Sequence, residues 1–353
     1  MTVRIIQGDC RDMLKTLPDE SVHCCVASPP YFGLRDYGSA GQMGLEATPD
    51  EYVIGMVAVF REVRRILRPD GTLWLNMGDS YAGGGRGGIG DKSTLEGTHK
   101  NQNESGVALI ASQRRDNALV PRSARRYAGL KGKDLIGIPW MLAFALRADG
   151  WYLRQDIIWS KPNPMPESVR DRCTKSHDYL FLLSRSKRYH FDQEAILEPS
   201  SAGTHARLAQ DIEKQIGSAR AFGGKKANGP MKAVARGKSK IGQFGVKNNP
   251  GFSESICLRV PNRNKRSVWE IPTHAFKGAH YATFPPRLVE PCILAGCPIG
   301  GTVLDPFGGS GTVGLVAERL QRNAILIEIK SEYVDMAYHR IRADAPLLFE
   351  GYF

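Results

Sequence analysis

Short apolar runs alternate with segments of helical periodicity along most of this chain, and the alternation predicts an α/β fold. The runs at residues 22–27, 72–77 and 302–304 are almost continuously apolar, as in the buried strands of a parallel sheet. Residues 48–51 read Thr-Pro-Asp-Glu, a capping box with proline in the first turn. The helix that begins there is expected to end at the Pro-Asp-Gly of residues 69–71.

The remaining segments complete an open, mostly parallel sheet with helices around it. Ordered structure is expected to resume at residues 268–272, and residues 189–191 are expected to form a hairpin arm. The other expected strands are 3–7, 151–159, 179–184 and 324–329, and the other expected helices are 11–17, 135–148, 284–294, 312–320 and 332–341.

The first candidate site is the turn after residues 22–27, which reads Ser28-Pro29-Pro30-Tyr31. Two consecutive prolines have no N–H to continue a ladder, so the turn is a stiff elbow. It lies at the carboxyl end of a strand, where open α/β sheets bind their ligands. Its hydroxyl, carbonyls and aromatic face suit a flat group with N–H donors, such as a nucleobase amine. The same residues also occur in surface turns, so the interpretation needs a second motif.

The second motif is a glycine-rich turn, Asp305-Pro306-Phe307-Gly308-Gly309-Ser310-Gly311-Thr312, which follows a strand and opens a helix. The next strand ends near Glu328. Glycines let the backbone approach a ligand, and an acid at the following strand end binds ribose hydroxyls. The glycine spacing departs from the dinucleotide pattern, and Asp305 and Phe307 suit an amine and an adenine ring. The turn therefore predicts S-adenosyl-L-methionine rather than NAD.

Positive charge is concentrated in two segments without periodicity. The chain has 48 lysines and arginines against 36 acidic residues, a net charge of +12. Residues 199–268 hold 14 basic and 3 acidic residues, and residues 83–134 hold 10 and 5. Localised positive charge releases counterions from phosphates and is typical of nucleic-acid binding. A solvated face without a partner is the alternative interpretation.

Length, hydropathy and cysteine spacing exclude other classes of protein. The 353 residues suffice for one large domain with an appended piece. No apolar run approaches the roughly 20 residues of a membrane span, and the N-terminus has no signal-peptide architecture. We therefore expect a cytoplasmic protein without membrane contact. The seven cysteines are scattered and lack zinc spacing, so reduced thiols and no metal are expected.

These motifs resemble those of amino-group DNA methyltransferases of the circularly permuted β class, in which the catalytic motif precedes the cofactor motif. The elbow matches the catalytic tetrad and the glycine-rich turn matches the cofactor loop. Residues 280–285 resemble the segment before that loop, and Gly8-Asp9-Cys10 resembles the turn near the adenine. The resemblance covers most of residues 1–80, 135–191 and 267–341. It implies a Rossmann-like sheet of about seven strands with an inserted target-recognition region.

The resemblance also implies the residues of each site. The expected catalytic residues are Ser28, Pro29, Pro30 and Tyr31. The expected contacts of S-adenosyl-L-methionine are Asp9, Cys10, Thr283, Phe284, Asp305, Phe307, Gly309, Ser310, Gly311, Thr312 and Glu328. The expected contacts of duplex DNA, on phosphates and guanine edges, are Arg35, Lys225, Lys226, Lys232, Arg236, Lys238, Lys240, Arg263, Lys265 and Arg266.

The implied organisation has three parts. Residues 1–198 form a catalytic half with a basic loop at 83–134 that is mobile without DNA, residues 199–267 recognise the target, and residues 268–353 form the cofactor half. The implied reaction flips a base out of the duplex and stacks it on Tyr31. Ser28 and the Pro29 carbonyl hold its amine during attack on the sulfonium methyl group.

Several alternatives remain at this point. Serine at the first tetrad position is more typical of cytosine N4 enzymes in this family, so cytosine N4 is favoured and adenine N6 is the alternative. The dipeptide Pro291-Cys292 lies in an expected helix, which argues against a carbon-5 methylase. A DNA-binding protein without turnover, an RNA methylase and a dehydrogenase are the other classes. The recognition sequence, the oligomeric state and pairing with a restriction endonuclease are left open.

Overall fold

A computed structural model describes residues 1–34, 38–39, 41–82, 129–200, 262–273 and 284–344. The chain forms two compact units. The first is built from residues 1–195 and 266–353, and the second from residues 196–265. Both sequence motifs lie in the first unit. Within the described ranges, no helix is long and apolar enough to cross a lipid bilayer.

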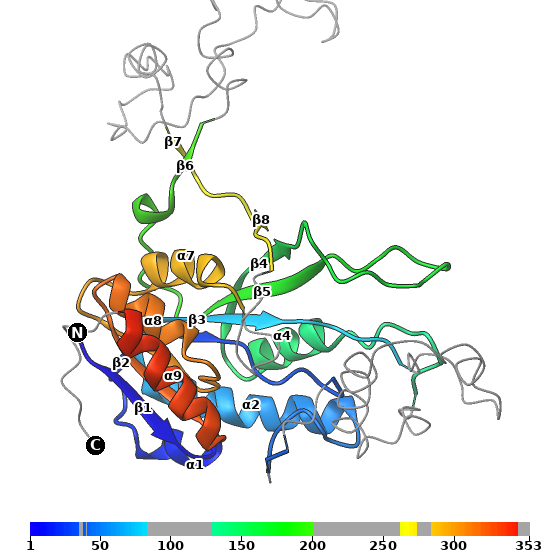
Figure 1. The fold of residues 1–353 in the computed structure, drawn as a ribbon, viewed down its shortest axis with the longest axis horizontal. Helices are drawn as coiled ribbons and strands as arrows, with labels where there is room; N and C mark the ends of the chain where they lie inside the picture. The colour runs from blue at the N-terminus through cyan, green and yellow to red at the C-terminus, as the bar shows by residue number, and fades with distance from the viewer. Residues whose placement is uncertain (35–37, 40, 83–128, 201–261, 274–283, 345–353) are drawn as a thin grey trace, which may run out of the picture. The chain divides into compact units, whose positions relative to one another are not determined.

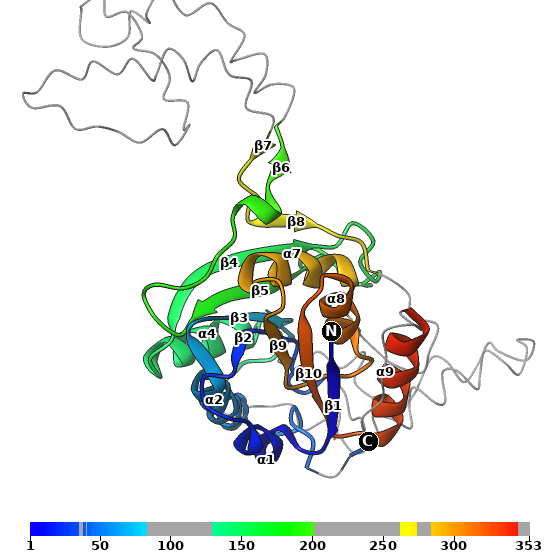
Figure 2. The ribbon, with the colours of Figure 1, turned by 90° about the vertical axis from the view of Figure 1, so that its left-hand side faces the viewer.

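The first unit contains one eight-stranded sheet with the strand order β1-β10-β9-β2-β3-β5-β4-β8. Strand β5 runs antiparallel to β3 and β4, whereas the other neighbouring pairs are parallel. The order places β9 directly beside β2, although the two strands come from opposite ends of the chain (Figure 2). The strands are β1 (Val3–Gln7), β2 (Val22–Ala27), β3 (Leu67–Met77), β4 (Tyr152–Ser160), β5 (His177–Ser184), β8 (Val268–Glu270), β9 (Thr302–Asp305) and β10 (Asn323–Glu328).

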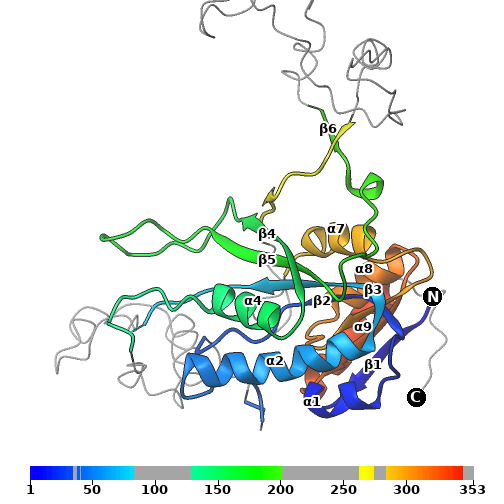
Figure 3. The same ribbon diagram turned by 180° about the vertical axis from the view of Figure 1, so that it is seen from behind.

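Helices cover both faces of this sheet. The helices α1, α2 and α4 lie on one face, and α7, α8 and α9 lie on the other (Figures 1 and 3). The predicted Rossmann-like α/β fold is therefore confirmed. The helices are α1 (Cys10–Met13), α2 (Pro49–Ile66), α4 (Ile138–Ala148), α7 (Pro286–Gly296), α8 (Thr312–Arg319) and α9 (Ser331–Asp344), with short 3-10 helices at Leu14–Thr16 and Glu194–Ile196.

The apolar runs are explained by burial between the two helical layers. Cys24 and Cys25 of β2 are fully buried, as are Leu304 of β9 and Leu75 of β3. A strand with helices on both faces has no solvent side, so its sequence is apolar throughout instead of alternating. The described cysteines are free, and all of them except Cys173 are buried.

Tertiary contacts change the predicted ends of two helices. Helix α2 ends at Ile66 and not at the Pro-Asp-Gly segment, because Leu67 is extended and pairs with Val22 of β2. The segment expected to stop the helix is therefore part of β3. Helix α4 begins at Ile138 instead of residue 135. Gly137 has a left-handed φ of 85°, which is not helical, so the helix cannot extend to the residues before it.

The predicted hairpin arm at residues 189–191 is wrong. The N–H of His190 donates to the carbonyl of Asp70, and no strand forms at this position. Phe191 instead stacks on Trp74, with ring centroids 6.3 Å apart. Packing of two aromatic rings outweighs the local strand tendency of the Tyr-His-Phe segment.

The described part of the second unit is a short two-stranded ladder. Strand β6 (Glu198–Pro199) pairs antiparallel with β7 (Asn262–Arg263). The carboxylate of Glu198 lies 3.1 Å from Nζ of Lys265 and 3.6 Å from Nε of Arg263. Two basic side chains of this ladder therefore share one carboxylate.

Candidate active site

The Ser-Pro-Pro-Tyr elbow begins where β2 ends. The strand stops at Ala27, and Ser28 and the two prolines that follow have no regular structure. The Pro30 carbonyl accepts a hydrogen bond of 2.8 Å from the hydroxyl of Tyr52, a fully buried residue of α2. Because neither proline supplies an N–H, this side-chain bond is what ties the elbow to the helical layer.

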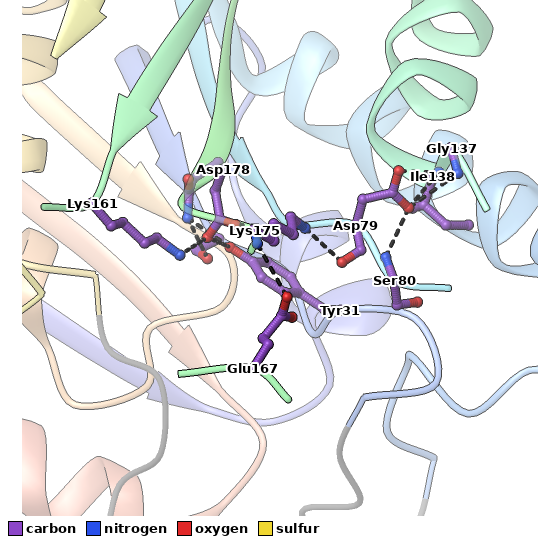
Figure 4. A network of polar contacts seen from close by, with 11 residues as sticks. Tyr31, Asp79, Ser80, Gly137, Ile138, Lys161, Glu167, Lys175 and Asp178 are labelled. Carbon is purple, nitrogen blue, oxygen red and sulfur yellow. Dashed lines mark hydrogen bonds and ion pairs between the residues drawn. The ribbon is translucent and has the colours of Figure 1, made fainter. Parts of the chain in front are cut away.

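The two polar side chains of the elbow share one partner, Asn76 near the end of β3. Its Nδ2 donates to Oγ of Ser28 at 3.2 Å and to the hydroxyl of Tyr31 at 2.9 Å. Asp178 of β5 lies on another side of the same hydroxyl, at 3.4 Å (Figure 4). The carboxylate of Asp178 also forms an ion pair of 2.5 Å with Lys161. The elbow therefore faces a polar cluster built by two neighbouring strands.

The glycine-rich turn joins β9 to α8, and its backbone N–H groups donate hydrogen bonds to the end of β10. The N–H of Gly308 donates to the carbonyl of Ile327, and the N–H of Gly309 donates to Oε2 of Glu328 at 2.8 Å. Gly311 has a left-handed φ of 77°, and a Cβ there would lie 2.8 Å from Cβ of Ala337 in α9. Only glycine permits both that conformation and that approach.

Two carboxyl groups lie under this turn, the buried one of Asp305 and the half-buried one of Glu328. Burial raises the pKa of Asp305 to about 7. The hydrogen bond from the N–H of Phe307 lowers this pKa, and the charge of Glu328 raises it. Burial also raises the pKa of Glu328, whereas hydrogen bonds from the N–H groups of Lys330 and Gly309 lower it. Both pKa values are raised because these carboxyl groups are partly or fully removed from water in the folded protein.

The elbow and the turn line one cleft, with about 1090 Å³ of empty space that is partly open to solvent. Most sequence-predicted residues lie in its lining. From the elbow these are Ser28, Pro29, Pro30 and Tyr31, and from the cofactor prediction they are Asp9, Cys10, Phe284, Phe307, Gly309, Ser310, Thr312 and Glu328.

Two predicted cofactor residues are placed differently, and a third is not described. Asp305 and Gly311 do not line the cleft. Asp305 is 1% exposed and closes the turn through the N–H of Phe307, and Gly311 packs against α9. These contacts give both residues a supporting place in the turn. Thr283 lies outside the described residues.

Sequence reasoning missed part of the cleft and its supports. Ile329, Lys330 and Tyr333 line it just after the acidic strand end, and proximity to Glu328 was the available signal. The other lining residues outside the predicted set are Gly8, Leu34, Gly41, Gln42, Met43, Pro306, Gly308 and Ile327. Nη1 of Arg340 in α9 donates to both oxygens of Ser310 and to Oγ1 of Thr312, at 2.9 to 3.1 Å. No local sequence signal identifies Arg340, because its position beside the turn depends on how α9 packs.

A second, much smaller hollow, with about 210 Å³ of empty space that includes open solvent, also borders Tyr31. It is lined by residues of three segments, Tyr31, Phe32, Leu34, Gly78, Asp79, Ser80 and Ile138. The carboxylate of Asp79 accepts hydrogen bonds from the N–H groups of Gly137 and Ile138, so it caps α4. Tyr31 is therefore shared by two cavities, one of which also contains the glycine-rich turn.

Most of the predicted DNA contacts cannot be compared with this site. Seven of them lie outside the described residues, namely Arg35, Lys225, Lys226, Lys232, Arg236, Lys238 and Lys240. Arg263 and Lys265 belong to the second unit, where both approach Glu198. Arg266 is exposed in the first unit, and its carbonyl accepts from the indole N–H of Trp269.

The chain is similar in sequence to curated methyltransferases over nearly its whole length. The type II methyltransferase M.SmaI of Serratia marcescens is 41% identical, over 96% of this chain and 90% of that protein. The type II methyltransferase M.Cfr9I of Citrobacter freundii is 40% identical, over 96% of this chain and 88% of that protein. The N6_N4_Mtase family model, described as DNA methylase, matches residues 22–339.

Solved structures show the same fold at lower sequence identity. TTHA0409 of Thermus thermophilus, solved in complex with S-adenosyl-L-methionine, has a TM-score of 0.54 and 20% identity, over 98% of this chain and 96% of that one. The PvuII DNA methyltransferase (cytosine-N4-specific) has a TM-score of 0.54 and 16% identity, over 99% of this chain and 87% of that one. With the family match spanning both motifs and the cleft they share, this chain belongs to the N6/N4 family of DNA methylases, whose methyl donor is S-adenosyl-L-methionine, as the glycine-rich turn predicted.

Proposed function

We propose that this protein is a site-specific type II DNA methyltransferase that methylates N4 of a cytosine flipped out of duplex DNA. The observation that carries the proposal is the single cleft lined by both the elbow and the glycine-rich turn. The relatives M.SmaI and M.Cfr9I, which are named type II methyltransferases, support the class of enzyme. The elbow precedes the turn in the chain, which is the motif order of the circularly permuted β class.

The residues of the cleft fit S-adenosyl-L-methionine. The carboxylate of Glu328 lines the cleft at the end of β10 and matches ribose hydroxyls in hydrogen-bonding chemistry. Phe307, Phe284 and Tyr333 supply aromatic faces for a purine. When bound, S-adenosyl-L-methionine supplies an electrophilic methyl group on a sulfonium.

The elbow performs the orienting part of the reaction in this proposal. Tyr31 stacks on the flipped base, while Oγ of Ser28 and the carbonyl of Pro29 accept hydrogen bonds from its exocyclic amine. These acceptors direct the nitrogen lone pair into the cleft and stabilise the positive charge that develops on that nitrogen. The prolines restrict the backbone that carries the Pro29 carbonyl before the base arrives, because each ring fixes its own φ angle.

The choice of cytosine N4 over adenine N6 rests on Ser28 at the first position of the elbow. A serine hydroxyl accepts one amine hydrogen without adding a buried charge to the site. Adenine N6 presents the same amine chemistry and is the alternative target atom. The methylated base in the product distinguishes the two target atoms, and the geometry of the elbow does not.

Duplex DNA would be held mainly by the basic segments. We infer that residues 199–267 recognise the target and that residues 83–134 form a basic loop within the catalytic half, 1–198, with the cofactor half at 268–353. The charge excess of these segments supports contacts to phosphates. A restriction endonuclease of the same specificity would be the functional partner of a type II enzyme.

The proposal is tested by transfer of a labelled methyl group to duplex DNA, followed by mapping of the modified base. The expected product is N4-methylcytosine at one recognition sequence. Tyr31→Ala should abolish transfer while leaving S-adenosyl-L-methionine binding within a few-fold of wild type. Tyr152→Ala, at an exposed tyrosine of β4, is the matched control and should retain activity.

Each remaining outcome assigns a different function. N6-methyladenine in the product would identify the alternative target atom. Preferred transfer to RNA over duplex DNA in a competition would identify an RNA methylase. Specific DNA binding without any transfer would identify a DNA-binding protein that only keeps the fold.

A further inference from the structure

Tyr31 lies in a seat formed by the carboxyl end of β3 and by β5. The seat consists of Gly78 against one edge of its ring and of Asn76 and Asp178 at its hydroxyl. None of these three residues belongs to the elbow or to the glycine-rich turn. Their arrangement constrains the position of the ring and the direction of its hydroxyl group.

Gly78 fixes the position of the ring. A Cβ at this residue would lie 2.3 Å from Cε2 and 2.8 Å from Cδ2 of Tyr31. Atoms cannot approach that closely, so the ring occupies the space that any side chain at Gly78 would fill. The tyrosine therefore packs directly on the backbone of the chain just after β3.

Asp178 and Asn76 fix the hydroxyl. Asp178 is 6% exposed, and its carboxylate is paired with Lys161 at 2.5 Å and lies 3.9 Å from Lys175 (Figure 4). An ionised carboxylate only accepts hydrogen bonds, so the Tyr31 hydroxyl donates towards it. The oxygen of that hydroxyl then accepts from Nδ2 of Asn76 at 2.9 Å. These two contacts place the phenol hydroxyl between Asn76 of β3 and Asp178 of β5.

Asn76 also donates a hydrogen bond to Ser28. Its side chain is almost fully buried, and the second hydrogen of Nδ2 is directed at Oγ of Ser28, 3.2 Å away. With one lone pair engaged by Asn76, Ser28 keeps its other lone pair and its hydrogen for a substrate. The direction of hydrogen bonding therefore runs from Asn76 to both hydroxyl groups of the elbow and from Tyr31 to Asp178.

We propose that Asn76 and Asp178 are positioning residues for methyl transfer, which orient Tyr31 and Ser28 before the target base enters. The inference rests on the proposed roles of Tyr31 and Ser28. Asp178 acts through the Tyr31 hydroxyl and not on the substrate. Its ion pair with Lys161 compensates the buried charge, so the carboxylate stays available as an acceptor.

The test is a double-mutant cycle between Asp178→Asn and Tyr31→Phe. Tyr31→Phe keeps the stacking ring and removes only the hydroxyl. Asp178→Asn should lower kcat about tenfold in the wild-type background but less than about twofold in the Tyr31→Phe background, because the group through which it acts is gone. The dissociation constant of S-adenosyl-L-methionine, measured by calorimetry, should stay within about twofold throughout.

Several controls separate positioning from folding. Asp19→Asn removes another ion-paired aspartate, one that pairs with Arg65 and lines neither cavity, and should leave kcat unchanged. If Asp178→Asn lowers the melting temperature too far to assay, Asn76→Asp tests the same seat. That variant keeps the shape of Asn76 but replaces its donor by an acceptor. Its loss of kcat should shrink only in part in the Tyr31→Phe background, because Asn76 also acts on Ser28.

An equal loss of kcat in both backgrounds would overturn the inference, and so would an unchanged kcat in Asp178→Asn. A loss confined to S-adenosyl-L-methionine binding would also contradict it. These results differ from failure of the proposed function, in which Tyr31→Ala itself would retain methyl transfer.

Discussion

The two walls of the cleft are built by different means. In the wall that carries the glycine-rich turn, the turn's own backbone N–H groups donate, that of Gly308 to the carbonyl of Ile327 and that of Gly309 to the carboxylate of Glu328. In the wall that carries the elbow, the donors are side chains of neighbouring elements, the hydroxyl of Tyr52 on Pro30 and the amide of Asn76 on Ser28 and Tyr31. The turn therefore contributes backbone donors to its own support, whereas the elbow depends on donors from other parts of the chain.

The largest expected effect follows from placing a side chain under Tyr31. Gly78→Ala should lower kcat about a hundredfold, because a displacement of the stacking ring by about an ångström is enough to misalign the base. The affinity for S-adenosyl-L-methionine should change little. Gly132→Ala, at a glycine with open space around its Cβ position, is the control. Equal losses of cofactor affinity and of kcat would mean that the two walls are not separable.

The buried acid of the other wall predicts a pH dependence of stability. The pKa of Asp305 rises from 3.8 to about 7 on folding, so the folded protein binds more protons than the unfolded chain between these values. The contribution of this group to the free energy of unfolding is therefore full below pH 3.8 and falls as pH rises towards 7. Asp305→Asn keeps the acceptor for the Phe307 N–H but cannot titrate.

The measurement is the free energy of unfolding by urea at several pH values, in wild type and in Asp305→Asn. The difference between them should change by on the order of 3 kcal/mol between about pH 4 and about pH 7, with wild type losing stability relative to the variant. A difference that is constant with pH would show that Asp305 has an ordinary pKa in the folded protein.

A pair of glycines with the same backbone conformation isolates the close approach at Gly311. Gly311 and Gly300 have φ angles of 77° and 75°, but a Cβ at Gly300 meets nothing within 4 Å. Both alanine variants should lose about 1 kcal/mol from the left-handed conformation. Gly311→Ala should lose about 1 to 3 kcal/mol more, because its Cβ overlaps Ala337. Equal melting temperatures would contradict this account of the turn.

The smallest expected effect concerns the one long side chain that supports the turn from α9. Arg340→Met should raise KM for S-adenosyl-L-methionine about fivefold, because the Ser310 and Thr312 oxygens lose a donor worth about 1 kcal/mol. The kcat at saturation should stay unchanged. Arg342→Met, at an exposed residue of the same helix, is the control. A loss of kcat would indicate that α9 also acts on the elbow wall.

The same contrast explains what could be predicted from the sequence. The two prolines of the elbow and the glycines of the turn constrain their own backbone, so both motifs were visible in the chain alone. Asn76, Asp178 and Arg340 gave no such signal. Their roles depend on the pairing of β3 with β5 and on the packing of α9 against the turn, which local pattern does not specify.

The predictions of secondary structure likewise succeed where the local pattern is strong and fail where tertiary contacts decide. The apolar run of β2 was predicted with its observed bounds because burial on both faces leaves a strong pattern. The start of α4 and the segment at 189–191 were not, because a left-handed Gly137 and the stacking of Phe191 on Trp74 decide them. Tertiary contacts override local tendency where the pattern is short.

The most direct test of the central claim is photocrosslinking of labelled S-adenosyl-L-methionine to the protein, followed by peptide mapping. The claim is that the elbow and the glycine-rich turn, from opposite ends of the chain, line one cleft. We expect label in peptides from both regions, around Tyr31 and around Phe307 or Tyr333, and competition by unlabelled cofactor. Label confined to peptides outside the cleft would contradict it.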